Sequence, residues 1–486
     1  MALFLATIYD RYMKKRLPIT IGLLSISLSV LTACASANES TNNVKEEPAQ
    51  LLVEATDEQS ATDEQNASDV ANAESELPED ETMNEEKDIP SLRDCFPANF
   101  GGAMIGCAVT GDEINDPGVF DILTKHFNAV TIGNELKPDA IFNYSNNKCP
   151  GTESADINGQ TIEVPKLSFV RAEKILDKIY DWNEANPDRK IMVRGHVLVW
   201  HSQTPEWFFH VNYDKNGDYV DAATMNLRLE WYIREMLTHF TGPDSKYKDM
   251  FYGWDVVNEA VSDNTGSLRT DNENPSEKLS QDTHGNNSSW YHIYGNEDFI
   301  INAFTYANKY APETLELYYN DYNECDIKKK KGITELLMAI KKKEGAPGEG
   351  TRIDAMGMQG HYQMENPNQT AVEASIKDYC AIVGKVQFTE LDIQASDGFD
   401  GTKGSIEEEN EKLRKRYNML YYSMKSAVNT GGANVSNVTF WGTVDKYSWL
   451  QFRNDVGGGS KSSRKQMPLL FDDNYEPKPA FYVFLN

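Results

Sequence analysis

The sequence predicts an α/β fold in which eight parallel strands close into a (β/α)8 barrel, the TIM-barrel architecture. Three observations lead to this prediction. Short apolar runs alternate with helix-period segments, polar or aromatic side chains follow seven successive runs, and no Gly/Ser- or Pro-rich linker divides residues 91–486. Eight strands with helical crossovers is the number that closes such a barrel, and barrels with insertions reach this length as a single domain.

Eight apolar runs have the length and composition of buried strands. Between them, apolar residues recur with helical spacing most clearly over Lys166–Tyr180 and Ile333–Lys341. The chain therefore alternates strand and helix, which is the order of a parallel barrel. The predicted strands are Ala103–Val109, Ala129–Gly133, Lys190–Gly195, Gly253–Asn258, Thr314–Tyr319, Asp354–Gln359, Lys385–Thr389 and Asn437–Trp441.

The first part of the chain, residues 1–34, is predicted to be an export signal. Three basic residues precede the apolar stretch Leu17–Leu31, which is too short for a comfortable membrane span. The stretch ends in Leu-Thr-Ala-Cys34, which resembles the bacterial lipobox, in which the cysteine is acylated. We therefore expect lipidation at Cys34 and an exported protein, held at the cell surface or secreted. The alternative is an ordinary secretory signal with a chance cysteine.

Residues 35–90 are predicted to form an acidic, disordered tether. Between Asn38 and Asp88 the chain holds 17 acidic residues and two lysines, with no aromatic residue and no sustained apolar period. Such a segment cannot bury enough apolar surface to offset the entropy of ordering it. Much of the formal net charge of −28 therefore lies outside the folded domain.

Charge and cysteine content exclude several classes of function. No basic cluster occurs that could follow a nucleic-acid backbone, so no nucleic-acid partner is expected. The only membrane contact expected is through the lipid on Cys34. The other five cysteines lack metal-ligand spacing, and one or two disulfides are possible in an exported protein. We expect a monomer that uses no metal and no cofactor.

Polar and aromatic side chains follow the ends of the second to eighth predicted strands. In a barrel all these strand ends open on one face, where the catalytic groups of such enzymes lie. Any one of these residues is most simply structural, but seven successive strands that end this way predict a shared site. The residues are Asn134, Glu135, Lys137, His196, Trp200, His201, Gln203, Asn258, Glu259, Asn320, Asp321, Gln359, His361, Glu390, Asp392, Trp441, Asp445 and Trp449.

Two glutamates in this set, Glu259 and Glu390, end the fourth and seventh strands. Glycoside hydrolysis uses two carboxyl groups over one site: an acid protonates the leaving oxygen, and a carboxylate attacks the sugar or activates water. A single strand-end carboxylate is weak evidence, because such groups often form ion pairs or cap helices. The pair, surrounded by other polar strand ends, predicts glycosidase chemistry.

Seven motifs stand around these positions in a fixed order: Asn134–Lys137, Gly195–Trp207, Trp254–Glu259, Tyr319–Tyr322, Gly357–His361, Thr389–Asp392 and Trp441–Trp449. In residues and order they resemble glycoside hydrolase family 10, the endo-β-1,4-xylanases. The run Gly195–Trp207 is specific by itself. The resemblance covers nearly all of residues 91–486, and the family's (β/α)8 barrel agrees with the fold predicted above.

The resemblance implies retaining hydrolysis of internal β-1,4-xylosidic bonds in xylan or xylo-oligosaccharides, with Glu390 as nucleophile and Glu259 as acid/base. Glu259 must then keep its proton while Glu390 is charged and release it once Glu390 becomes an ester. The resemblance also implies substrate-binding roles for Asn134, Glu135, Lys137, His196, Trp200, Gln203, Asn258, Gln359, His361, Trp441 and Trp449. Trp207 and Trp254 are interpreted as structural.

Two segments depart from the family pattern. The loop from Val261 to Trp290 is longer and more acidic than expected, and we interpret it as a solvated surface insertion. The alternative is that it reshapes the leaving-group subsites, because it lies next to Glu259. In addition, Tyr318 and Tyr319 directly precede Asn320, so the sequence does not decide which tyrosine, if either, reaches the substrate.

Two other functions stay open at the level of sequence. A β-1,4-glucanase of the same barrel type would share both glutamates and differ in its sugar pocket. A surface glycan-binding lipoprotein without catalysis is the second, and the intact Glu259, Glu390 and Asn258 count against it, because binding alone does not need both carboxyl groups.

Overall fold

The computed structural model describes residues 89–143, 148–277, 279, 285–397, 399, 401–453 and 466–486. All of them belong to the unit Glu85–Asn486. The predicted export signal with Cys34, and the tether up to residue 88, lie outside the described residues.

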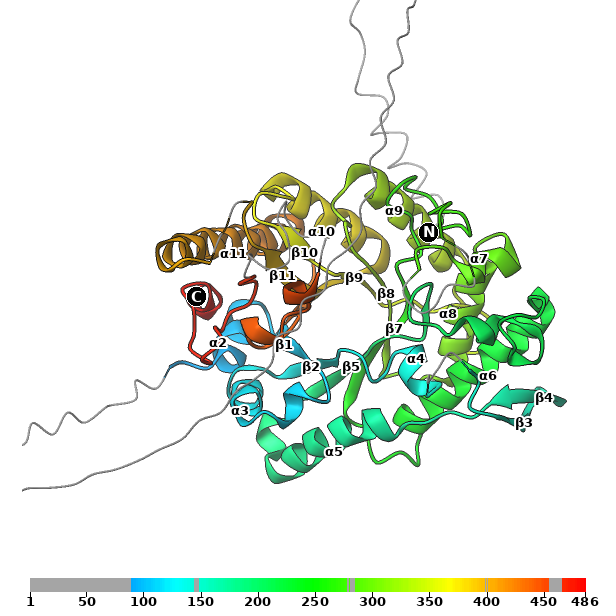
Figure 1. Ribbon diagram of the computed structural model, residues 1–486. Coiled ribbons are helices and arrows are strands. Elements are labelled where there is room, and N and C mark those ends of the chain that lie inside the picture. The colour runs from blue at the N-terminus through cyan, green and yellow to red at the C-terminus, as the bar shows by residue number, and fades with distance from the viewer. Residues whose placement is uncertain are drawn as a thin grey trace, which may run out of the picture. The chain divides into compact units, whose positions relative to one another are not determined.

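Parallel strands form a closed barrel with helices around it, which confirms the predicted fold class (Figure 1). The last strand returns to the first, so that Met104 lies opposite Asn437 and Cys107 opposite Phe440. Each predicted strand overlaps an observed one. The barrel strands are β1 (Met104–Val109), β2 (Ala129–Ile132), β5 (Met192–Gly195), β7 (Phe251–Asn258), β8 (Glu316–Asp321), β9 (Ala355–Met358), β11 (Val386–Gln394) and β12 (Val435–Phe440).

The barrel strands are buried on both faces, because helices cover the outside and side chains fill the inside. All four residues of β2 and all four of β9 are buried. The interior also holds a charged pair, in which Arg194 of β5 binds Asp255 of β7 and both side chains are 1% exposed. Burial on both faces explains why continuous apolar runs, rather than alternating ones, predicted these strands.

Helices follow the strands around the outside, and several begin at a capping side chain. Asp221 accepts a hydrogen bond from the Thr224 N–H at 2.8 Å. The predicted helix Ile333–Lys341 lies inside α9, whereas the one predicted over Lys166–Tyr180 begins later, because the Ser168 N–H donates to the Ile141 carbonyl instead. The helices are α2 (Leu92–Asn99), α3 (Pro117–His126), α4 (Pro138–Ile141), α5 (Val170–Ala185), α6 (Ala222–Thr241), α7 (Ser289–Tyr294), α8 (Asp298–Tyr310), α9 (Ile327–Lys342), α10 (Gln369–Val383) and α11 (Lys403–Gly431). In the part of the chain that is described, no helix is long and apolar enough to cross a bilayer.

An antiparallel hairpin between α4 and α5 was not predicted. Its strands are β3 (Thr152–Ile157) and β4 (Gln160–Pro165), and its turn consists of Asn158 and Gly159, whose φ angles of 53° and 81° are both positive. An Asn-Gly pair is the residue choice that a two-residue hairpin turn requires. The hairpin lies outside the barrel sheet.

Two short strands extend the barrel at the carboxyl ends of its strands. β6 (Val199–Trp200) pairs with the end of β7, so that Trp200 lies opposite Asn258. β10 (His361–Gln363) pairs with the end of β11, so that His361 lies opposite Asp392. Both pairings place predicted site residues beside each other, because the side chains of paired residues point to the same face of the sheet.

The five cysteines of the described region, Cys95, Cys107, Cys149, Cys325 and Cys380, are all free thiols. The disulfides that the sequence allowed are therefore not formed among them. Pairing between β1 and β12 closes the barrel.

Candidate active site

A deep cleft of about 1490 Å³ opens at the carboxyl ends of the barrel strands. All but one of the predicted catalytic and substrate-binding residues of the barrel line it. The lining residues among them are Asn134, Lys137, His196, Trp200, Gln203, Asn258, Glu259, Gln359, His361, Glu390, Trp441 and Trp449. The barrel topology thus gathers side chains from six strands and their following loops into one site.

Glu390, the predicted nucleophile, is 5% exposed, and both of its carboxylate oxygens are bound. The Asn320 amide donates to Oε1 at 2.8 Å, and His361 Nε2 lies 3.2 Å from Oε2. Burial alone would raise the pKa of this carboxyl, but the hydrogen bond from His361 and the electrostatic contributions of His196 and His361 outweigh burial and lower the pKa to about 2. A carboxyl group with a pKa this low is ionised at neutral pH, as a nucleophile requires.

His361 lies between two carboxylates, because its Nδ1 is 2.8 Å from Asp392 Oδ1 while its Nε2 faces Glu390. Burial lowers the pKa of this imidazole, but the charge and hydrogen bond of Asp392 and the contact with Glu390 raise it to about 10. An imidazolium donates from both ring nitrogens, which satisfies both carboxylates. Asp392 also accepts a hydrogen bond from Trp449 Nε1 at 2.7 Å, and this fixes the indole ring at the cleft wall.

Glu259, the predicted acid/base, follows β7 with a positive φ of 54°. Its Oε1 accepts hydrogen bonds from Asn258 Nδ2 at 3.0 Å and Gln359 Nε2 at 2.9 Å, and its Oε2 accepts one from Trp200 Nε1 at 2.9 Å. All three donors are neutral. Oε2 has the fewer partners among the described residues, so it is the oxygen with room for a proton.

Two amide side chains connect the glutamates. Asn320 Nδ2 donates to Asn258 Oδ1 at 2.9 Å as well as to Glu390, and Asn258 in turn donates to Glu259. Thr389 Oγ1 donates to Asn320 Oδ1 at 2.6 Å and so fixes which end of that amide faces the carboxylates. Asn320 was predicted as a strand-end residue without a role, and its central place depends on contacts that no sequence pattern reports.

On the other side of the cleft, Lys137 lies in a group with Asn134 and Gln203. Its ammonium donates to Asn134 Oδ1 at 3.1 Å and to Gln203 Oε1 at 3.0 Å, and it lies 5.2 Å from the centre of the Trp200 ring. Burial lowers the pKa of Lys137, while Glu390 and other carboxylates oppose the shift. The group presents fixed donors and acceptors, which suits recognition of sugar hydroxyl groups.

His196 is held by a charge inside the barrel. Its Nδ1 lies 2.9 Å from Asp255 Oδ2, and Asp255 is itself paired with Arg194. The imidazole packs edge-on against Trp441 at 5.6 Å between ring centres. Asp255 was not predicted as a site residue, although it stands within the Trp254–Glu259 motif. The contact with Asp255 fixes the orientation of the His196 ring, which lines the cleft.

Several predicted residues lie away from the cleft. Glu135 is turned toward Gly111, whose N–H donates to Oε1 at 2.8 Å, so its substrate contact stays a prediction without support from this placement. Asp445 is 1% exposed and paired with Lys478. Trp207 and Trp254 are fully buried, which confirms their structural interpretation. Tyr318 and Tyr319 are also fully buried and do not line the cleft, so neither reaches a substrate there.

The interpretation of the loop after Glu259 as a solvated insertion is wrong for its first part. Ser262 is fully buried and Arg269 is 4% exposed. The segment folds back on itself, because Ser262 N–H donates to the Ser267 carbonyl at 2.8 Å and Arg269 N–H to the Ala260 carbonyl at 2.7 Å. Further along the same loop, Gly285 and Asn286 line the cleft.

The described residues contain no group of three or more His, Cys, Asp or Glu side chains that could hold a metal ion. The cleft does contain two glutamates, Glu259 and Glu390, at strand ends. One is an ionised carboxylate beside an imidazolium, and the other is a carboxyl group among neutral donors, connected to the first by amides. Two carboxyl groups at the carboxyl-terminal face of a (β/α)8 barrel are the arrangement that glycoside hydrolysis uses.

The chain belongs to glycosyl hydrolase family 10, whose family model matches residues 91–486. It is 33% identical over 392 residues to a bifunctional endo-1,4-beta-xylanase XylA of Ruminococcus flavefaciens, with 80% of this chain and 33% of the relative covered. It is 31% identical over 402 residues to an endo-1,4-beta-xylanase of Geobacillus stearothermophilus, with 82% and 98% covered.

The chain thus spans about a third of the length of the Ruminococcus relative. Among solved structures, it resembles the N-terminal endo-1,4-beta-D-xylanase 10B modules of Clostridium thermocellum in complex with xylohexaose. That match has a TM-score of 0.62 and 30% identity, and covers 82% of this chain and 67% of the other.

Proposed function

We propose that the protein is an endo-1,4-β-xylanase that hydrolyses internal β-1,4-xylosidic bonds of xylan or xylo-oligosaccharides with retention of configuration. The names of the relatives support the substrate class. The observation that carries the chemistry is the ionised Glu390, bound by His361 and Asn320, in one amide network with Glu259.

In the first step a carboxylate oxygen of Glu390 forms a bond to the anomeric carbon while the bond from that carbon to the leaving oxygen breaks. Glu259 gives its proton to that oxygen, so that the leaving sugar departs as an alcohol. The negative charge of Glu390 disappears as the ester forms, and the proton affinity of Glu259 falls with it.

In the second step the Glu259 carboxylate takes a proton from water, and the water oxygen attacks the anomeric carbon. The ester bond to Glu390 breaks, and both carboxyl groups return to their starting states. Each step inverts the anomeric carbon, so the two together retain its configuration.

The surrounding residues bind the sugar in this proposal. Asn258, next to the acid/base, bonds the sugar 2-hydroxyl, a contact that strengthens in the transition state. Trp441 and Trp449 offer apolar faces to the C–H bonds of sugar rings. Lys137, held by Asn134 and Gln203, donates hydrogen bonds to the hydroxyl groups of the sugar that lies beside it.

The defining experiment compares purified protein on xylan and on carboxymethyl-cellulose, with product analysis by chromatography. We expect release of short xylo-oligosaccharides from xylan and little reducing sugar from the cellulose derivative. Equal or faster hydrolysis of cellulose would instead identify a β-1,4-glucanase. Binding of xylan without hydrolysis would identify a glycan-binding lipoprotein.

We also propose that the protein is exported and held at the cell surface as a lipoprotein through Cys34, with residues 35–90 as a tether. The lipobox-like Leu31–Cys34 supports this proposal. Full-length protein expressed in a bacterium should label with a fatty-acid probe and sediment with membranes, and a Cys34→Ala variant should do neither. Labelling that survives this substitution would contradict the anchor. Gel filtration of the barrel should give a monomer.

A further inference from the structure

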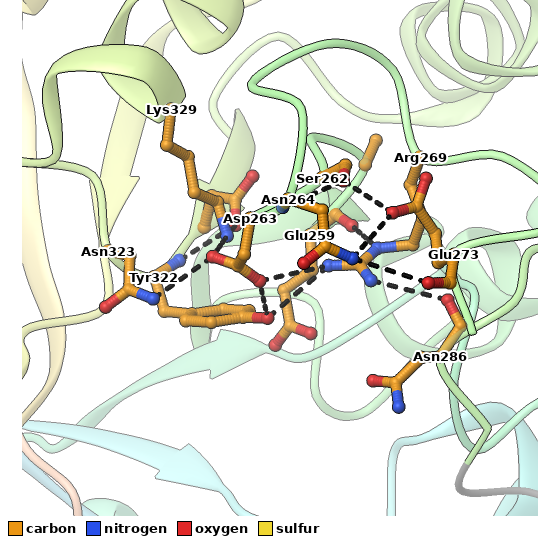
Figure 2. Close-up of polar contacts among 12 residues, drawn as sticks. Glu259, Ser262, Asp263, Asn264, Arg269, Glu273, Asn286, Tyr322, Asn323 and Lys329 are labelled. Carbon is orange, nitrogen blue, oxygen red and sulfur yellow. Dashed lines mark hydrogen bonds and ion pairs between the residues drawn. The ribbon is translucent and has the colours of Figure 1, made fainter. Parts of the chain in front are cut away.

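The loop that follows Glu259 is tightly folded beside the acid/base (Figure 2). Its two limbs meet in a bridge between Val261 and Leu268. Glu273 fastens it further along, accepting hydrogen bonds from Ser262 Oγ at 2.5 Å and from the Thr270 N–H at 2.8 Å. The fold of this segment therefore determines where Arg269, between these anchors, presents its guanidinium.

The Arg269 guanidinium is 4% exposed and reaches three parts of the cleft wall at once. Its Nε donates to the main-chain carbonyl of Glu259 at 3.0 Å, and one terminal nitrogen donates to the carbonyl of Asn286 at 3.3 Å. The other terminal nitrogen lies 3.4 Å from the Tyr322 hydroxyl and 3.6 Å from Asp263. The planar guanidinium carries donors that point in different directions and can therefore reach all of these partners. A lysine ammonium does not provide such a planar fork of donors.

The peptide unit after Glu259 is held at both of its polar ends. Its carbonyl accepts from Arg269, and its N–H, that of Ala260, donates to the Tyr319 hydroxyl at 3.0 Å. Glu259 itself has a left-handed φ of 54°, a conformation that a residue with a side chain adopts only when its surroundings impose it. Among the described residues, Arg269 and Tyr319 are the side chains that hold the peptide unit following this residue.

The same guanidinium is connected to the cleft wall on the side of Glu259. Asp263 accepts hydrogen bonds from the Tyr322 hydroxyl, from Asn323 Nδ2 at 3.1 Å and from Lys329 Nζ at 2.8 Å. Tyr322 and Asn323 line the cleft. Because Glu259 protonates the leaving group in the proposed function, the wall beside it is where the leaving sugar lies. Arg269 and Asp263 thus tie the acid/base backbone to that wall (Figure 2).

Charge alone does not account for this cluster. Two cations, Arg269 and Lys329, face two carboxylates, Asp263 and Asp321, with Lys329 Nζ 3.0 Å from Asp321. Each cation is thus paired with a carboxylate inside the cluster, and the hydrogen bonds of Arg269 to main-chain carbonyls, which are uncharged, define positions.

We propose that Arg269 is a positioning residue for proton donation: it fixes the main chain of Glu259 and, through Tyr322 and Asp263, the wall that receives the leaving sugar, so that donor and acceptor of the proton keep one geometry. This inference rests on the proposed function, because it assigns Glu259 the role of acid/base. It also predicts that the loop after β7 acts on leaving-group departure and not on nucleophilic attack.

The test compares two substrates that differ in their need for a proton. When a xylo-oligosaccharide is cleaved, the leaving sugar departs as an alkoxide unless its oxygen is protonated. When a 2,4-dinitrophenyl β-xylobioside is cleaved, the leaving group is the stable 2,4-dinitrophenolate anion, which needs no proton from the enzyme. For Arg269→Met we expect kcat/KM to fall ~100-fold on xylo-oligosaccharides and less than ~10-fold on the dinitrophenyl glycoside, which is the range that general acid catalysis supplies. Arg269→Lys should lose nearly as much, because it keeps the charge but not the fork.

Arg228→Met is the matched control. Arg228 is also a buried arginine, 6% exposed, whose guanidinium donates to the main-chain carbonyls of Phe208 and His210, but it does not line the cleft. Loss of Arg228 should lower the melting temperature, but any decrease in kcat/KM should be equal on the two substrates. Asp263→Asn changes a side chain that is 32% exposed and should perturb the fold less. It should show the same difference between the two substrates as Arg269→Met, with a smaller loss of kcat/KM.

Equal losses on both substrates for Arg269→Met and Asp263→Asn, or full activity of Arg269→Lys, would overturn the proposal. Crystal structures of the two variants test the proposal independently of activity measurements. In Arg269→Met both the Glu259–Ala260 peptide and the Tyr322 ring should move. In Asp263→Asn only the Tyr322 ring should move. An unmoved Glu259 in Arg269→Met would also overturn it. If the wild type hydrolysed neither xylan nor xylo-oligosaccharides, the proposed function would fail, while these structures would still decide the role of Arg269.

Discussion

The surroundings of Glu390 and of Glu259 differ in almost every physical respect. Glu390 is 5% exposed within β11, and its carboxylate contacts the imidazolium of His361 and the amide of Asn320. Glu259 is partly exposed, follows its strand in a left-handed conformation, and receives hydrogen bonds only from neutral side chains among the described residues. Its main chain is held from a loop, by Arg269.

The difference follows from what each group must do. A nucleophile needs one protonation state throughout the approach of the substrate, and a fixed cation on a rigid strand supplies it. An acid/base must lose and regain a proton in every turnover, so a permanent cation on its carboxyl would hold it in the wrong state for half of the cycle. The neutral donors and the support through the main chain place no such cation in hydrogen-bond contact with the Glu259 carboxyl among the described residues.

Removal of the nucleophile should have the largest effect. Glu390→Ala should lower kcat on xylan by ~10⁵-fold or more, because the covalent route is lost altogether. Azide added to this variant with a dinitrophenyl β-xylobioside should restore turnover and give an α-linked azide, identified by NMR. A β-linked azide would show that another residue is the nucleophile.

Removal of the acid/base should have a smaller effect that depends on the leaving group. Glu259→Ala should lower kcat/KM on xylo-oligosaccharides by ~10³-fold, within the range of general acid catalysis, but the first step with a dinitrophenyl glycoside only slightly. A burst of dinitrophenolate followed by slow turnover, seen by stopped-flow absorbance, is the expected signature. No burst, together with an equal loss on both substrates, would contradict the assigned role.

Replacement of His361, the cation beside Glu390, should make the surroundings of Glu390 more like those of Glu259. In the free enzyme the pKa of Glu390 is lowered to about 2, so activity should persist as the pH falls until that value is approached. His361→Asn removes the donor and the charge that lower this pKa, so the acid limb of kcat/KM should move upward toward the ordinary carboxyl value of about 4.3. The rate at neutral pH should fall by ~10²-fold, as for the loss of one charged donor. An unmoved acid limb would show that His361 does not keep Glu390 ionised.

The smallest effect is expected from Trp200→Phe, which removes the one donor that the described residues offer to Glu259 Oε2 and keeps an aromatic ring. One hydrogen bond of about 1 kcal/mol corresponds to a change of ~5-fold in rate. The loss should be greater for oligosaccharides than for dinitrophenyl glycosides. Measurement of kcat/KM on both substrates tests whether the neutral donors act on Glu259 alone.

The sequence predicted the barrel well because its strands are buried on both faces and read as short, continuous apolar runs. The hairpin of β3 and β4 was missed, since its strands are largely exposed and carry no apolar run. Its Asn158-Gly159 turn was the signal that could have found it. The start of α5 was placed too early, because hydrogen bonds from Lys166 and Ser168 to other segments are not visible in a periodicity.

The candidate site was predictable where a side chain stands at a strand end, since the barrel itself brings such residues together. Glu259, Glu390 and most of the sugar-facing residues belong to this class. Arg269 and Asp263 do not, because their positions depend on the path of a folded loop. Asn320 and Asp255 were predictable only in part. Their motifs were recognised, but their roles follow from the atoms that they contact.

The free cysteines have a practical consequence for anyone who produces this protein. Burial raises the pKa of Cys325 to about 12 and that of Cys107 well above its ordinary value, and a thiol that stays protonated resists oxidation and alkylation. Because none of the five thiols of the described region is cross-linked, the barrel does not depend on a disulfide among them to fold. It should therefore reach the same fold in a reducing cytoplasm as in an oxidising compartment, and its melting temperature should be insensitive to dithiothreitol.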